Sequence, residues 1–127
     1  MNLMNASIKS DQRLETIEYA RKAVDVASEK QATDILLLDI RQVTTFADYF
    51  LIMTAESRRQ MEALSEDMEQ VLKLSGVALH HREGTPEAGW LLLDFSDVIV
   101  HLFAPEERGL YKLEELWSTG QQVVRIQ

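Results

Sequence analysis

The stretch Tyr49-Phe50-Leu51-Ile52-Met53-Thr54 decides the fold of this 127-residue chain. It is an unbroken run rich in aromatic and branched side chains, which is typical of a strand covered by protein on both faces. A second run of this kind, Ile35-Leu36-Leu37-Leu38-Asp39-Ile40, precedes it. Because strands this apolar need cover on both sides, we predict an α/β (α+β) domain in which a single mixed sheet is flanked by helices.

Three helices are predicted around these strands. Apolar residues at helical spacing predict a helix over residues 11–30, and Ser57 with Gln60 forms a capping box before a second helix that ends at Gly76. Pro105 opens a final helix, with acidic residues near its positive end. The apolar side of that helix carries Leu110, Leu113, Leu116 and Trp117.

Further strands are predicted in the second half of the chain. Residues 77–82 are interpreted as a short strand and residues 83–89 as a polar turn. The apolar runs 90–95 and 98–103 are separated only by Ser96 and Asp97, which predicts a hairpin. The element order is therefore α-β-β-α-β-β-β-α, with about five strands in the sheet.

The chain is predicted to form one domain. Residues 1–10 have no hydrophobic period and are interpreted as a flexible arm, residues 11–118 as the domain, and residues 119–127 as a tail. Val123, Val124 and Ile126 alternate with polar neighbours in that tail, so it either adds a strand or stays loose.

Composition excludes several classes of function. The 13 basic and 21 acidic side chains give a formal net charge of −8, which disfavours a broad groove for nucleic acid and binding to anionic membranes. The chain has no cysteine, hence no disulfide, no thiolate nucleophile and no zinc site built on sulfur. Residues 1–10 do not resemble a secretory signal, and we expect a cytoplasmic protein without a cofactor.

Candidate catalytic residues are few. Asp34, Asp39, Asp48, Asp94 and Asp97 fall near strand ends, where aspartates bind divalent cations or, more often, cap turns. His80 and His81 are adjacent on a strand edge and point to opposite faces, so they cannot share one metal ion. His101 lies inside an apolar strand, where a structural role is favoured over general-base catalysis.

Aromatic residues near the end of the chain are candidate binding residues. Trp90, Tyr111 and Trp117 occur in segments that also carry Arg108 and Glu114. Aromatic and arginine side chains anchor many protein interfaces, but tryptophans at strand or helix spacing also fill cores. Both interpretations remain open from the residues alone.

An ordered series of short motifs resembles the ribosomal silencing factor family, also called the Iojap-related family. The series runs from about Ala20 to Ser118. It consists of residues 47–52 (Ala-Asp-Tyr-Phe-Leu-Ile), Ser57, Gln60, Glu83-Gly84, Trp90, Asp94, residues 97–101 (Asp-Val-Ile-Val-His), Arg108, Tyr111, Leu113, Glu114 and Leu116-Trp117. Each motif alone is weak, whereas their order is specific.

The resemblance implies a nucleotidyltransferase-like fold without the active site, usually as a homodimer. It implies binding to the large ribosomal subunit through that subunit's basic fourteenth protein, at the face that meets the small subunit. Occupying this face blocks subunit joining and represses translation when nutrients are short, with contacts to ribosomal RNA left open. The alternative, from the implied fold and the strand-end aspartates, is a small metal-dependent nucleotidyl-transfer enzyme.

Carried over to this sequence, the family's contact surface falls on Trp90 and Tyr111, with Arg108 and Glu114 supporting or extending it. The resemblance implies no catalytic and no metal-binding residue. This chain departs from the family in having Ala55 and Ser96 where glycine is common. A serine at a hairpin position with positive φ costs about 1 kcal/mol or forces a different turn.

Overall fold

The computed structural model describes residues 2–117 and 119–127, with side chains from Thr16 onward. A single mixed sheet of six strands has the order β3-β4-β5-β2-β1-β6. Strands β2 and β5 run parallel, and all other neighbours are antiparallel. The mixed sheet is therefore confirmed, with one strand more than the five expected. The strands are β1 (Thr33–Asp39), β2 (Tyr49–Thr54), β3 (His81–Thr85), β4 (Trp90–Asp94), β5 (Val98–Phe103) and β6 (Gln121–Ile126).

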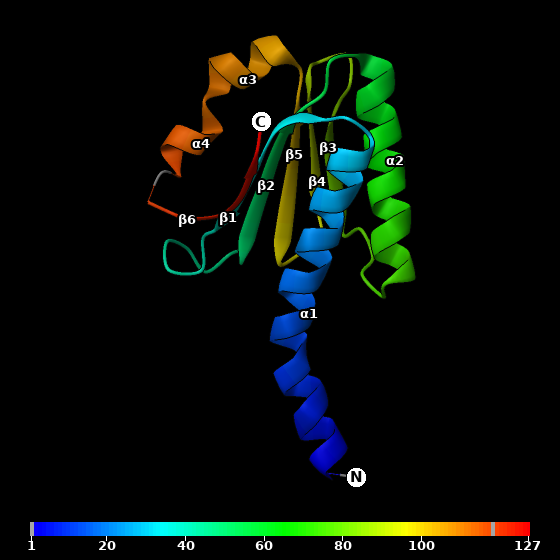
Figure 1. The fold of residues 1–127 in the computed structure, drawn as a ribbon, viewed down its shortest axis with the longest axis vertical. Helices are drawn as coiled ribbons and strands as arrows, with labels where there is room; N and C mark the ends of the chain where they lie inside the picture. Colours follow the sequence, from blue (N-terminus) through cyan, green and yellow to red (C-terminus); the bar gives the residue numbers. More distant parts are fainter. Residues whose placement is uncertain (1, 118) are drawn as a thin grey trace.

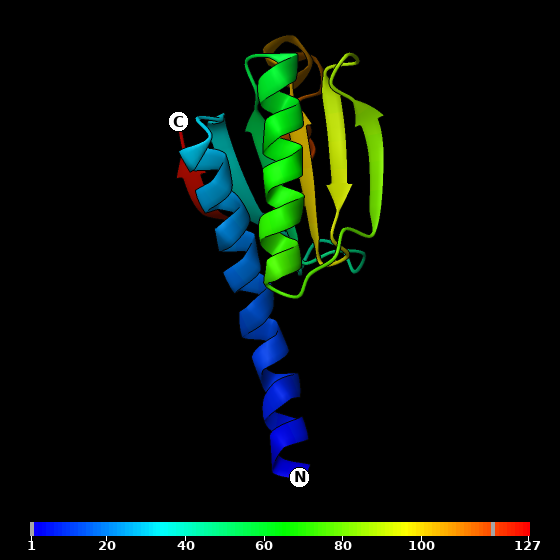
Figure 2. The same cartoon turned by 90° about the vertical axis from the view of Figure 1, so that its right-hand side faces the viewer.

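Helices lie on both faces of the sheet, as the two apolar runs predicted. Helices α1 (Asn2–Glu29) and α2 (Arg58–Leu74) pack side by side on one face, and α3 (Pro105–Tyr111) and α4 (Leu113–Leu116) lie over the other (Figures 1 and 2). Alternate residues of each central strand enter different cores. The core under α1 and α2 includes Ile35, Leu37, Leu51, Met53, Val100 and Leu102. The core on the opposite face, which we call the second core, includes Leu36, Leu38, Phe50, Ile52, Ile99 and Phe103.

Helix α1 is longer than the sequence predicted. Its backbone is helical from Asn2, so it includes the residues that we expected as an irregular arm. The N-terminal half of the helix projects beyond the sheet (Figure 1). No helix in the described part of the chain combines the length and apolar character that crossing a bilayer requires.

The capping box of α2 forms largely as predicted. The Ser57 hydroxyl accepts a hydrogen bond from the Gln60 backbone N–H at 3.0 Å, and the Gln60 side chain accepts one from the Glu56 N–H at 2.6 Å. The amide of Gln60 also donates to the carbonyl of Lys30 at 2.9 Å, which joins the start of α2 to the end of α1. Gly76 follows the helix with a φ of +88°, as expected for the residue that ends it.

One edge strand differs from the sequence prediction, and the other resolves an alternative that the sequence left open. Strand β3 occupies residues 81–85 rather than 77–82, so the first three residues of the predicted turn belong to the sheet. The tail forms β6, which pairs antiparallel with β1. Strand β3 is exposed at every position, so its pairing with β4 rather than a hydrophobic pattern decides where it lies. Strand β6 packs Val123 and Val124 against the core.

The predicted final helix is broken in two. Lys112 has a φ of +48°, which ends α3 and reorients the chain before α4. Leu113 and Trp117 consequently pack on the second core, whereas Leu110 and Leu116 are exposed. The prediction that these four residues form one apolar side of a single helix is therefore wrong.

The hairpin between β4 and β5 is confirmed. Ser96 adopts a φ of +72°, and its backbone N–H donates to a carboxylate oxygen of Asp94 at 2.7 Å. The chain thus keeps the turn that glycine would favour despite the serine side chain. Ala55, the other departure from the family pattern, is fully buried without a positive φ.

Candidate docking site

Trp90 and Tyr111 lie together on the face of the sheet that α3 and α4 partly cover. Trp90 is the first residue of β4 and lies opposite Phe103 of β5, with the two ring centroids 5.1 Å apart. Tyr111 ends α3, and the centroid of its ring is 4.7 Å from that of Trp90. Trp90 is half-buried, and Tyr111 remains 47% exposed. The tertiary structure therefore brings together the two aromatic residues that the sequence singled out.

These rings line an apolar cavity of about 280 Å³, which we call the aromatic pocket. The carboxylate of Glu83 lies on its border, where one oxygen is 3.0 Å from a ring nitrogen of His81. Both of these side chains are exposed, as expected for a solvated strand edge. A shallow apolar surface with a polar border is typical of a protein contact. The pocket is lined by Glu83, Gly84, Ala88, Trp90, Leu92 and Tyr111.

Two glycines hold the backbone close to the pocket. A Cβ atom on Gly84 would lie within 2.1 Å of the Trp90 carbonyl oxygen, and one on Gly89 within 2.3 Å of the Glu107 carboxylate. Both glycines also have positive φ angles, of +83° and +78°. A larger residue at Gly84 would displace the strand that carries Trp90, whereas at Gly89 the positive φ is what favours glycine, because the Glu107 side chain can move.

Arg108 and Glu114 lie beside the pocket and contact each other. Arg108 is only 7% exposed, and its Nε donates to Glu114 Oε2 at 2.6 Å. The same guanidinium donates to the hydroxyl of Thr54 at 3.0 Å and lies 3.5 Å from a carboxylate oxygen of Asp34. Asp34 also accepts a hydrogen bond from Arg125 of β6 at 2.8 Å. Arg108 therefore fixes α3 and α4 to the sheet, which is a supporting role rather than an exposed contact.

The pocket also contains residues that the sequence did not single out for binding. Leu92 follows Trp90 at the spacing of two that places both on one face of β4. Gly84 and Ala88 belong to the hairpin formed by β3 and β4, and this hairpin places them in the pocket lining. The alternation along β4 could have identified Leu92, but the shifted bounds of β3 concealed the other two.

His101 lies behind Trp90 and is buried. Its Nδ1 atom is 3.2 Å from the indole Nε1 of Trp90, so the indole N–H donates to it. Burial lowers the pKa of His101 to about 4. The ring is therefore neutral at physiological pH, and it has no place in the pocket lining.

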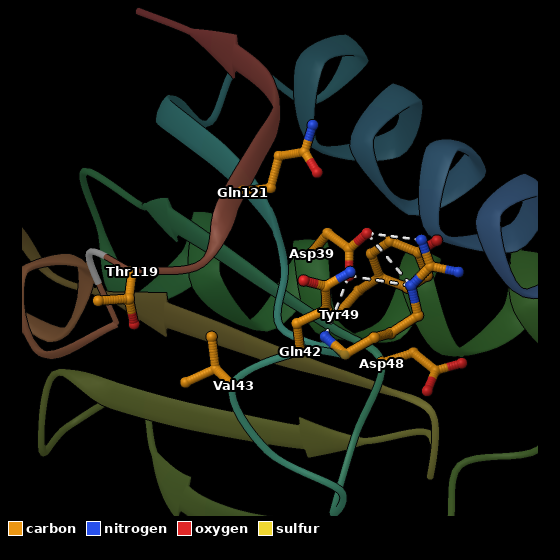
Figure 3. Close-up of a pocket in the computed structure, with 8 residues that line it drawn as sticks. Asp39, Gln42, Val43, Asp48, Tyr49, Thr119 and Gln121 are labelled. Carbon is orange, nitrogen blue, oxygen red and sulfur yellow. Dashed lines mark hydrogen bonds and ion pairs between the residues drawn. The ribbon is translucent and has the colours of Figure 1, made fainter.

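A larger, more polar cavity of about 490 Å³ lies at the end of the sheet where β1 ends and β2 begins (Figure 3). Asp39 projects toward it, but its carboxylate is bound by the guanidinium of Arg41, with the shortest N···O distance 2.7 Å. These hydrogen bonds from Arg41 lower the pKa of Asp39. The guanidinium also lies 5.5 Å from the centroid of the Tyr49 ring. The two most closely paired charges of this cavity therefore neutralise each other.

The remaining strand-end aspartates are dispersed. Asp34 pairs with arginines, and Asp94 caps the β4–β5 turn. Asp48 and Asp97 immediately precede the neighbouring strands β2 and β5, and the Asp48 N–H donates to the Asp97 carbonyl at 2.8 Å. Across the described residues, no three His, Asp or Glu side chains are grouped so that they could hold a metal ion.

The chain is a small domain with one mixed sheet, helices on both faces and an apolar pocket on one of them. A comparison with protein families matches residues 13–127 to "Ribosomal silencing factor during starvation". This chain belongs to that family. The match includes the tail, which the motif series did not reach, and the family is named for silencing rather than for a reaction.

Relatives and a solved structure agree with this assignment. The chain is 33% identical to a ribosomal silencing factor from Halalkalibacterium halodurans, over 84% of this chain and 91% of that protein. It is 39% identical to the one from Bacillus subtilis, over 76% and 81% of the two chains. The mouse protein "Mitochondrial assembly of ribosomal large subunit protein 1" is 31% identical, over 75% of this chain and 43% of its own. A crystal structure from Chromobacterium violaceum superposes with a TM-score of 0.76 at 31% identity, covering 85% and 89% of the chains.

Proposed function

We propose that this protein binds the large ribosomal subunit through its fourteenth protein, at the face that meets the small subunit. By occupying that face it blocks subunit joining in the cytoplasm and represses translation when nutrients are short. The aromatic pocket carries the proposal. Half-buried and exposed aromatic rings on a rigid sheet are typical anchors of a protein interface.

Charge favours a protein partner over ribosomal RNA. A chain with a net charge of −8 is repelled by phosphate, whereas a basic ribosomal protein attracts it and speeds the encounter. Glu83 on the border of the pocket places one of these negative charges beside Trp90. Any contact with ribosomal RNA is then peripheral to the pocket.

Arg108 and Glu114 support this surface from inside the protein. Their ion pair bridges the break between α3 and α4, and Tyr111 lies within the segment that the pair closes. In the proposed complex, Trp90 and Tyr111 contact the partner, while Arg108 and Glu114 keep Tyr111 over the sheet.

Cosedimentation with isolated large subunits tests the proposal. We expect the wild-type protein to move with the subunit, and Trp90→Ala to lose at least about 2 kcal/mol of binding free energy, the loss typical of an anchor residue. Leu74→Ala is the matched control, because Leu74 is 82% exposed on α2, across the sheet from the pocket. Circular dichroism establishes that each variant is folded.

A joining assay tests the consequence. Light scattering rises when the two subunits join. This rise should be smaller when wild-type protein is added to the large subunit first, and it should remain full when the Trp90→Ala variant is added instead. If Trp90→Ala binds and inhibits as well as wild type, the pocket is not the docking surface. If wild-type protein binds without reducing joining, steric blocking is wrong.

We also propose that the free protein is a homodimer. Exposed apolar side chains outside the pocket favour self-association: Phe46 is 58% exposed against the ring of Trp117, and Leu116 is 74% exposed. Multi-angle light scattering should give twice the mass of one chain for the wild-type protein. The variant in which serine replaces Phe46 and Leu116 should have the mass of a single chain. A wild-type protein that is monomeric at micromolar concentration would contradict this.

A further inference from the structure

His101 occupies a position where an apolar side chain would be expected. The rest of β5 is apolar, and His101 lies on the same face as Ile99 and Phe103, within the second core. The rings of Phe50 and Phe103 lie 5.1 and 6.2 Å from the imidazole, centroid to centroid. Packing alone would be satisfied by leucine or phenylalanine.

The hydrogen bond with Trp90 fixes the tautomer of His101. An indole N–H can only donate, so Nδ1 of the neutral imidazole accepts and the proton resides on Nε2. That Nε2 atom is buried and has no hydrogen-bond partner among the described residues. A buried donor without an acceptor destabilises a folded protein. The histidine therefore reduces the stability of this core, and what it supplies in return is an acceptor for Trp90.

The geometry explains why Trp90 needs that acceptor. Trp90 lies opposite Phe103 and Leu92 opposite His101, so Trp90 and His101 are diagonal neighbours across β4 and β5. The bond turns the N–H edge of the indole inward toward His101, and the opposite edge of the ring points away from it. Without this bond the N–H of the half-buried indole would have no hydrogen-bond partner among the described residues, and the ring could turn about its side-chain torsions.

We infer that His101 is a positioning residue that holds the Trp90 indole in the orientation that forms the aromatic pocket. This inference rests on the proposed docking role of that pocket. His101 itself does not contact the partner, because its side chain is buried behind Trp90.

A matched pair of variants tests the inference. Asparagine places its side-chain oxygen the same number of bonds from Cα as Nδ1, and leucine has nearly the same size without an acceptor. His101→Asn and His101→Leu both lose the ring, so they differ chiefly in the acceptor offered to Trp90. Ile99→Ala controls for a general loss of packing on the same face of β5.

Two measurements distinguish positioning from stability. In a ¹H–¹⁵N spectrum, with Trp117→Phe to assign the two indoles, the Trp90 N–H resonance should shift strongly in His101→Leu and less in His101→Asn. Binding to large subunits should weaken about tenfold in His101→Leu, the factor that corresponds to about one lost hydrogen bond. His101→Asn should stay within about threefold of wild type. Ile99→Ala should lower the melting temperature without weakening binding.

Trp90→Phe provides an independent test if His101→Leu does not fold. It keeps an aromatic ring but removes the N–H, so it should weaken binding by a similar factor. Where His101→Leu does fold, adding it to Trp90→Phe should cause no further loss of affinity for the large subunit, because the hydrogen bond is already absent.

The outcomes separate the inference from the proposed function. If Trp90→Ala abolishes binding but His101→Leu or Trp90→Phe binds as wild type, positioning by His101 is wrong and the docking site stands. If Trp90→Ala binds normally, the docking role of the pocket is wrong and the positioning role falls with it.

Discussion

Arg108 and Glu114 form an ion pair across the break between α3 and α4, with Arg108 Nε 2.6 Å from Glu114 Oε2. Because the guanidinium also reaches Thr54 and Asp34, this one side chain joins the C-terminal helices to two strands. The pair thus spans the segment that contains Tyr111, although neither residue lines the aromatic pocket.

Removing the arginine should destabilise the protein more than removing the glutamate charge. Arg108→Met leaves Thr54 and Glu114 without their partner and Asp34 with Arg125 alone, and we expect a loss of about 3 kcal/mol in unfolding free energy. Glu114→Gln leaves Arg108 paired with Asp34, so we expect a loss of about 1 kcal/mol in unfolding free energy. Urea unfolding measures both. Equal and small losses would mean that the pair does not fix α3 and α4.

Replacing Ser96 by glycine should stabilise the fold. Ser96 has a φ of +72°, which is strained for any residue with a Cβ atom. We expect Ser96→Gly to raise the unfolding free energy by about 0.5–1 kcal/mol. Ser96→Ala keeps the Cβ atom and is the control, with no gain expected. A gain of equal size in both variants would attribute the effect to the hydroxyl instead.

Stability should depend on pH through His101. Its folded-state pKa of about 4 lies below the unfolded value of 6.5, so acidification protonates the unfolded chain first. The unfolding free energy should therefore be constant above about pH 7 and fall by up to about 1.4 kcal/mol per pH unit between pH 6.5 and 4. The environment that produces this shift is the aromatic cluster of Phe50, Trp90 and Phe103.

His101→Leu isolates that contribution. Its unfolding free energy should show a smaller slope in the same window, measured by urea titration at each pH. Asp39, whose pKa is lowered by Arg41, acts only below about pH 4, the ordinary range of a carboxylate. An unchanged slope in His101→Leu would show that this histidine is not buried as described.

Binding to the large subunit should weaken as salt rises. Exposed charges are screened over about 8 Å at physiological ionic strength, so electrostatic attraction between an acidic protein and a basic one decreases. We expect the association rate to fall several-fold between about 50 and 300 mM salt, while the dissociation rate changes little. Stopped-flow mixing measures both rates. A salt-independent association rate would argue against a basic partner.

Much of the architecture was predictable because its signals are local. The run Tyr49–Thr54 is a strand with those bounds, and Ser57 with Gln60 begins a helix. The turn at Ser96 was also placed correctly. Strand β3 was misplaced because its residues are all exposed and carry no hydrophobic pattern. The final helix was drawn as continuous because no proline or glycine marks Lys112, whose left-handed conformation breaks it.

By itself, the sequence determined that this chain forms a mixed sheet covered on both faces and that Trp90, Tyr111, Arg108 and Glu114 form a set. Such facts follow from hydrophobic periodicity and from an ordered series of motifs along the chain. Only the tertiary structure decided which members of that set are accessible. The ring centroids of Trp90 and Tyr111 lie 4.7 Å apart although the two residues are 21 positions apart in the sequence. The side chain of Arg108 is buried, and His101 accepts the hydrogen bond from the Trp90 indole. These outcomes depend on strand register and on the direction that the chain takes after Lys112, and both are set by long-range packing.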